Sequence, residues 1–236
     1  MYGFLKFPVN LALLLCCCIL LWVLQREKPG WGLSRFLASG KLSTALLGLF
    51  LAACLLMGLI PQSAEGEGLH CIRRTPWFIG IYIMLLTNLW CVVASRFGRK
   101  RLRFTLNHAG LFLAMAAGLA GVPDESASRI RLERGAEGNM ELLDFVAEYH
   151  DNGTPRHYEA SVLIDGKVRK ISVNHPFRRF PGDDLYLVDY DRSQPQAAWC
   201  TLERVRQPWK PVIWLGIVMM MLGSVLMFTQ GAAKKK

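Results

Sequence analysis

The sequence predicts a membrane protein of five transmembrane helices, with a small extracytoplasmic all-β domain between the fourth and fifth helices. Two observations predict this fold class. Hydrophobic residues make up 52% of the 236 residues and gather in long runs, and a bilayer span needs about 20 mostly apolar residues. A polar stretch before the last run has short alternating segments, which are typical of the strands of a sandwich or an open barrel.

The apolar runs place the helices at about residues 8–24, 42–60, 77–93, 105–122 and 212–228. We therefore expect a membrane domain over residues 1–122 and a β-domain over 123–210. Residues 211–236 would hold the fifth helix and a basic tail. The first run has no small-residue cleavage site and is expected to be a retained anchor. The fourth run is rich in Gly and Ala, which predicts close packing against protein.

Charge predicts the orientation. The net charge is +10, and twelve basic residues lie in two short loops (residues 26–41 and 96–103) and in the tail 234–236. Lys and Arg in short loops stay cytoplasmic, so the N-terminus and the β-domain would face the outer, periplasmic side of an inner membrane. Contact with lipid headgroups accounts for most of this charge, and we expect no nucleic-acid partner.

Six alternating segments predict the strands of the β-domain. The strongest signal is Asp165-Gly166, a two-residue hairpin turn that requires positive φ at both positions. The predicted strands are residues 129–133, 142–149, 158–164, 167–173, 185–190 and 199–205.

The seven cysteines form neither a CxxC nor a CxxCH motif, which argues against a thioredoxin-type site and against covalent c-type haem. Five of them fall in apolar runs, where a thiol behaves as a small hydrophobe. Cys71 and Cys200 lie outside the runs, on the same predicted side of the membrane. They are expected either to form a disulfide between the outer loop and the β-domain or to remain free.

His108 is the main candidate for chemistry. It follows a cluster of basic residues and opens the fourth apolar run, beside Asn107. An imidazole in hydrocarbon needs a partner. It could ligate a haem iron or relay protons, or it could hydrogen-bond within the helix packing, to Asn107 or a neighbouring carbonyl. From the residues alone both alternatives stay open.

The other four histidines give weaker signals. His150 and His157 flank a turn without a carboxylate or cysteine at ligand spacing, so solvated turn residues are the expected interpretation. His175 precedes a proline and is expected to be structural. His70 lies next to Cys71 at the outer membrane surface, where a ligand role has little support.

An ordered set of short motifs is spread over about residues 42–228. They are GLIPQ from Gly58, PWF from Pro76, NLWC from Asn88, Arg96, HAG from His108, VNHPF from Val173, Gly182, Tyr186, Asp189-Tyr190, QPW from Gln207, and the span with Gly216 and Gly223. As an ordered set they resemble the ResB (CcsB) family of system II cytochrome c biogenesis proteins.

The resemblance implies a membrane complex with a tryptophan-rich CcsA-type partner. The complex would carry haem b across the membrane and present it for attachment to CxxCH apocytochromes c. His108 would be one axial ligand of the haem iron, with Asn107 orienting its ring. Further ligands would come from the partner. The chain lacks the partner's WGxxWxWD motif, so we do not expect the fused form.

The hypothesis also assigns two basic loops to the haem propionates. One is residues 96–103, with Arg99, Lys100, Arg101 and Arg103, and the other is residues 26–41. A thioredoxin-like reductant is a further expected partner. The chain would be a non-catalytic subunit of the haem lyase. Two alternatives are a cytochrome-b-like electron-transfer subunit and a membrane scaffold without haem.

Overall fold

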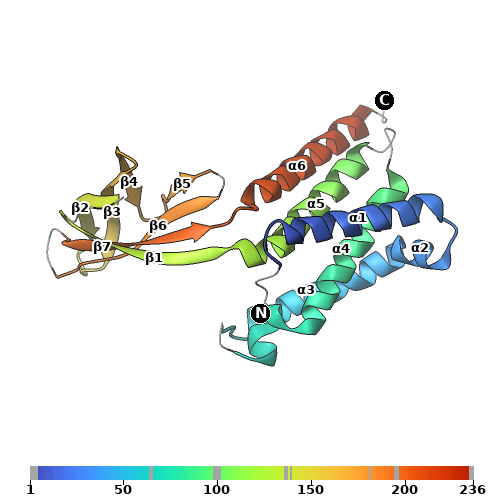
Figure 1. The fold of residues 1–236 in the computed structure, drawn as a ribbon, viewed down its shortest axis with the longest axis horizontal. Helices are drawn as coiled ribbons and strands as arrows, with labels where there is room; N and C mark the ends of the chain where they lie inside the picture. The colour runs from blue at the N-terminus through green and yellow to red at the C-terminus, as the bar shows by residue number, and fades with distance from the viewer. Residues whose placement is uncertain are drawn as a thin grey trace. The chain divides into compact units, whose positions relative to one another are not determined.

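The computed structural model describes residues 5–63, 66–97, 102–135, 138, 140–180, 182–193 and 197–233. The chain forms two compact units. One, called the helical unit below, consists of Met1–Ala120 and Val212–Lys236, and the other, the β-domain, is Gly121–Pro211. Figure 1 shows the helices of the first unit and the strands of the second.

Five helices in the described part of the chain are long and apolar enough to cross a membrane. Half of the α4 span is buried inside the protein, against 11% for each of the α1, α3 and α6 spans, so α4 is the centre of the helical unit. The predicted fold class is confirmed, and the chain is a multi-pass membrane protein. The helices are α1 (Val9–Glu27), α3 (Gly40–Leu59), α4 (Pro76–Arg96), α5 (Leu102–Gly121) and α6 (Lys210–Ala233).

Buried amides tie the short helix α2 (Gly32–Leu37) to its neighbours. Gln25 of α1 exchanges two hydrogen bonds with Ser34, of 3.1 and 2.9 Å. Asn88 of α4 donates to the carbonyl oxygen of Leu37 at 2.7 Å and accepts from the Ser43 hydroxyl at 2.7 Å. Polar groups inside a membrane protein need such partners, and these bonds fix the segment that joins α1 to α3. The short 3-10 helices η2 (Gly68–Arg74) and η4 (Val122–Asp124) precede α4 and follow α5.

Helices α5 and α6 lie side by side at glycine contacts (Figure 1). A Cβ atom added to Gly110 would lie 2.6 Å from the carbonyl oxygen of Gly216. The reverse holds as well, since a Cβ on Gly216 would lie 2.6 Å from the Gly110 oxygen and 2.8 Å from the Ala114 nitrogen. The glycine content of this run predicted such an approach.

The β-domain consists of two antiparallel sheets. One has four strands in the order β1-β7-β6-β5, and the other has three in the order β2-β3-β4. Leu142, Val162, Ile171 and Leu202 are fully buried and lie in one core cluster with contributions from both sheets. The strands are β1 (Ser126–Glu133), β2 (Met140–Tyr149), β3 (Pro155–Ile164), β4 (Lys167–Ser172), β5 (Phe177–Arg179), β6 (Asp183–Tyr190) and β7 (Trp199–Arg206).

The hairpin between β3 and β4 turns at the predicted dipeptide. Asp165 has φ of 49° and Gly166 has φ of 72°, which are the left-handed values that this tight turn requires. Strand β5 was not predicted, because three residues are too few to show an alternation of apolar and polar side chains.

Candidate functional site

His108 lies in the second turn of α5, and Phe104, one turn earlier, holds it in two ways. The Nδ1 atom of His108 is 2.9 Å from the backbone carbonyl oxygen of Phe104. The two rings are stacked, with centroids 3.9 Å apart and planes inclined by 24°. Both contacts come from the helix itself, so the ring is oriented without help from another element.

The hydrogen bond decides which nitrogen of His108 is free. A carbonyl oxygen can only accept, so Nδ1 must be the donor. In the neutral ring the lone pair then belongs to Nε2. His108 makes no other hydrogen bond within the described residues, and its side chain is half-buried. Histidines that ligate metals present one nitrogen in this way, with the other donating to a carbonyl or carboxylate.

Asn107 does not contact His108. Its Nδ2 donates to the carbonyl oxygen of Arg103 at 3.2 Å, and its Oδ1 accepts from the Ser224 hydroxyl of α6 at 3.2 Å. A Cβ on Gly223 would lie 2.9 Å from the Asn107 side chain. Consecutive residues project about 100° apart on a helix. In the structure Phe104 contacts the ring and Asn107 packs α5 against α6, while a role of Asn107 toward a bound haem stays a prediction.

Four aromatic side chains, called the aromatic wall below, line the helices next to this histidine. Phe112, one turn after His108 on the same face of α5, lies 4.7 Å from Trp90 of α4. Trp22 of α1 lies 6.0 Å from Trp90 and 5.2 Å from Phe97, as measured between ring centroids. The side of α5 that carries the imidazole therefore faces aromatic surface.

Two arginine side chains lie at the same end of the helical unit as His108. The guanidinium carbon of Arg96 lies 5.4 Å from the centre of the Phe104 ring. Arg103, predicted to contact propionates, is half-buried in the first turn of α5. The other residues with that predicted role, Arg99, Lys100 and Arg101, lie outside the described residues.

The sequence analysis did not identify Phe104 as the residue that contacts His108. The spacing could have indicated it, because an aromatic residue four positions before a histidine lies on the same face of a helix.

Cys71 and Cys200 both carry free thiols in the structure, and the disulfide between them stays a prediction. Cys200 has no exposed surface and belongs to the core cluster of the β-domain. That burial raises the pKa of its thiol to about 11.

The other histidines belong to no cluster of possible metal ligands within the described residues. The described residues hold no group of three or more His, Cys, Asp or Glu side chains that could bind a metal ion. His70 is exposed, with its Nδ1 3.1 Å from the Pro61 carbonyl oxygen. His175 lies in a tight turn, with its backbone N–H bound to Ser172.

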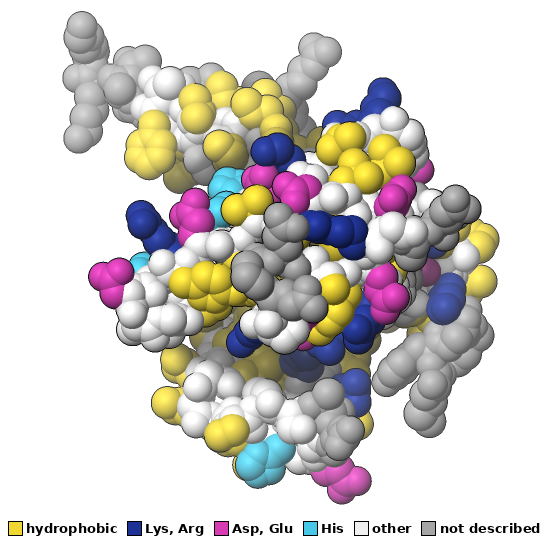
Figure 2. All heavy atoms as spheres, turned by 90° about the vertical axis from the view of Figure 1, so that its left-hand side faces the viewer, with side chains coloured by type: hydrophobic (Ala, Val, Ile, Leu, Met, Phe, Trp, Pro, Cys, Tyr) yellow, Lys and Arg dark blue, Asp and Glu magenta, His cyan; other side chains and the backbone are white. Residues whose placement is uncertain are grey.

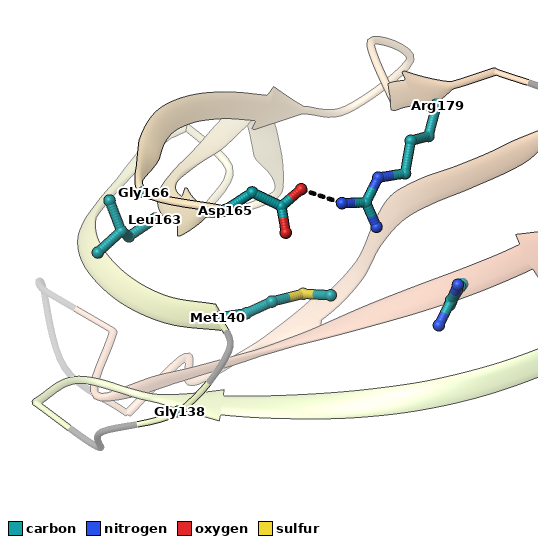
Figure 3. A pocket seen from close by; sticks show the side chains of 7 residues that line it. Gly138, Met140, Leu163, Asp165, Gly166 and Arg179 are labelled. Carbon is teal, nitrogen blue, oxygen red and sulfur yellow. Dashed lines mark hydrogen bonds and ion pairs between the residues drawn. The ribbon is translucent and has the colours of Figure 1, made fainter.

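The β-domain has a small pocket of about 400 Å³, and its visible face carries basic and acidic side chains interspersed (Figure 2). In the pocket, Asp165 and Arg179 point toward each other and form an ion pair (Figure 3). Arg204 donates to both oxygens of Asp183, at 2.8 and 2.7 Å, and this bond holds the pKa of that carboxyl below its usual value. Arg179 and Arg204, the two arginines that line the pocket, are each paired with a carboxylate. The pocket therefore offers no unpaired arginine to an anion.

These features define a multi-pass membrane protein with a β-domain of two antiparallel sheets. Residues 125–204 match the model of the ResB-like family. The matched segment runs from just before β1 into β7. The resemblance to ResB is thus confirmed over the β-domain.

Among solved structures, one titled "Cytochrome c Heme Lyase CcmF" is similar to this chain at 20% identity, with a TM-score of 0.39. The similarity covers 76% of this chain and 33% of that chain, so this chain spans about a third of that protein's length. A comparison with curated proteins finds no match.

Proposed function

We propose that this chain is a haem-binding membrane subunit of system II cytochrome c biogenesis, acting with a CcsA-type partner. The observation that carries the proposal is the bond from Nδ1 of His108 to the Phe104 carbonyl oxygen, because it leaves Nε2 for an iron atom. The match of residues 125–204 to the ResB-like family supports the choice of pathway.

The residues around His108 fit haem. Imidazole is a usual axial ligand of haem iron. The aromatic wall offers an apolar surface for a porphyrin face. Basic residues at the same end, such as Arg96 and Arg103, can meet the two propionates, since guanidinium groups recognise carboxylates well.

The site is half of a bis-histidine site. All five histidines lie in the described part of the chain, and His108 is the one in a membrane-spanning helix. A second imidazole at that depth would have to come from outside the described helices, which disfavours an electron-transfer subunit that keeps its haem alone. Haem is then the cargo. This chain holds and orients it, and the partner completes the ligation and aligns the haem with the apocytochrome thiols.

The proposal includes an orientation, with His108 at the cytoplasmic mouth and the β-domain in the periplasm. It is supported by the placement of Lys and Arg. A reporter active only in the periplasm, fused after Val122, is expected to be active, whereas the same reporter fused after Ala38, in the loop after α1, is expected to be silent. The reverse pattern would overturn the orientation.

The function is tested in cells from which this chain has been deleted. Covalently haem-stained cytochromes c are expected to disappear, while their apoproteins are still made and b-type haem proteins keep their haem. Reintroducing the chain should restore the stain. Normal c-type cytochromes in the deletion strain would refute the proposed function.

A further inference from the structure

The first helix, α1, contributes directly to the surroundings of His108. Trp22 of α1 contacts Phe97 and Trp90, with ring centroids 5.2 and 6.0 Å away. The indole N–H of Trp90 donates to the Cys18 carbonyl oxygen of α1 at 2.8 Å. Helix α1 therefore fixes the orientation of Trp90, whose ring packs on Phe112 one helical turn from His108.

Two arginines, Arg26 and Arg96, place their guanidinium groups over aromatic rings near His108. Arg26, in the last turn of α1, places its guanidinium carbon 5.1 Å from the Trp22 ring centre. Arg96, in the last turn of α4, lies 5.4 Å from the ring of Phe104, which is stacked on His108. The contact of Trp22 with Phe97, the neighbour of Arg96, brings the ends of the two helices together. Both cations thus border the same side of the unit as the imidazole.

Neither arginine has a counter-ion among the described residues. Arginines of the β-domain differ in this respect, as the bidentate pair of Arg204 with Asp183 illustrates. A guanidinium held on an aromatic face keeps all of its N–H donors available for an anion. The two arginines are therefore positioned and unpaired, which is the condition for binding carboxylates from a ligand.

We propose that Arg26 and Arg96 bind the two carboxylates of the haem whose iron His108 holds, and that α1 forms a wall of this site. The inference rests on the proposed function and deepens it, because it assigns the carboxylate contacts to individual residues and gives the first helix a role. An anion at this membrane depth can also be a lipid phosphate, and the experiment separates the two sources.

The full-length chain in phosphatidylcholine nanodiscs is titrated with haemin and with haemin dimethyl ester, and the Kd is read from the Soret band. Esterification removes both negative charges and leaves the iron and the porphyrin face unchanged. Arg26→Gln and Arg96→Gln are each expected to weaken haemin binding about fivefold, as the loss of a partly exposed charged contact does. Neither substitution should change the Kd of the ester.

Arg169→Gln is the matched control. Arg169 is an exposed arginine of β4 in the β-domain, its guanidinium carbon also lies over an aromatic ring (5.1 Å from the centre of Phe177), and its substitution removes the same charge. It should leave both Kd values unchanged. Equal weakening of haemin and ester binding by the Arg26 and Arg96 variants, or no weakening of either, would overturn the proposal in favour of lipid contact or helix packing.

If His108 does not ligate the haem iron, a different measurement will show it. It would appear as an unchanged axial-ligand spectrum in a His108→Gly variant with either porphyrin. The difference between haemin and its ester reports the carboxylate contacts alone, so the two failures are distinguishable.

Discussion

Replacing His108 with glycine is expected to lower the haem content of the complex co-purified with the proposed CcsA-type partner by at least about tenfold, because losing even a hydrogen-bond partner of a ligand costs metal sites about that much. The physical reason is the loss of Nε2, which the bond from Nδ1 to the Phe104 carbonyl oxygen leaves as the free lone pair. The remaining haem should show the absorption spectrum of a changed axial ligand. Pyridine haemochrome quantification and visible spectra measure both effects.

Adding free imidazole to the glycine variant tests whether the lost haem depends on the missing ligand. Glycine leaves a space beside Phe104 that free imidazole can fill, so haem content and the original spectrum should return. His150→Gly is the control, because His150 is exposed in the turn after β2 and its loss should change neither readout. Unchanged haem in the His108 variant, or a loss that imidazole does not reverse, would refute the ligand role and leave helix packing as the function of the imidazole.

The second large effect is expected from Gly216→Val in α6. The first added atom would lie 2.6 Å from the Gly110 carbonyl oxygen and 2.8 Å from the Ala114 nitrogen, and both of these are backbone atoms that cannot rotate away. We expect a destabilisation of about 3 kcal/mol, at the upper end of overpacking costs. Thermal unfolding of the detergent-solubilised chain, followed by circular dichroism, should show a lowered midpoint and a lower yield of monodisperse protein.

Gly48→Val in α3 is the matched control. It makes the same change in a membrane-spanning helix, but a Cβ on Gly48 would meet no atom within 4 Å. Its midpoint should stay close to that of the unmodified chain. If the two variants unfold alike, the close approach of α5 and α6 is not needed for stability.

The sequence by itself determined the five spanning helices, most strands and the turn between β3 and β4. Each depends on information within one segment: the length of an apolar run, the alternation of side chains along a strand, or the need for positive φ at Asp165 and Gly166. His108 was identifiable for the same reason, since a histidine inside an apolar run is conspicuous. Strand β5 was not predicted, because its three residues are too few to show an alternation of apolar and polar side chains.

Only the tertiary structure decided what each side chain near His108 does. Asn107 lies next to the histidine, and its role depends on which face of α5 meets α6. The close approach at Gly223 places Asn107 against Ser224, whereas the contact of His108 with the Phe104 carbonyl oxygen lies within α5.

The same holds for Cys200, whose burial in the β-domain core follows from the packing of two sheets. It holds also for Trp22, which the sequence places far from His108 and which the contact of α1 with α4 brings into its surroundings. Periodicity states which residues share a face, but the partner of that face is decided by contacts between distant segments.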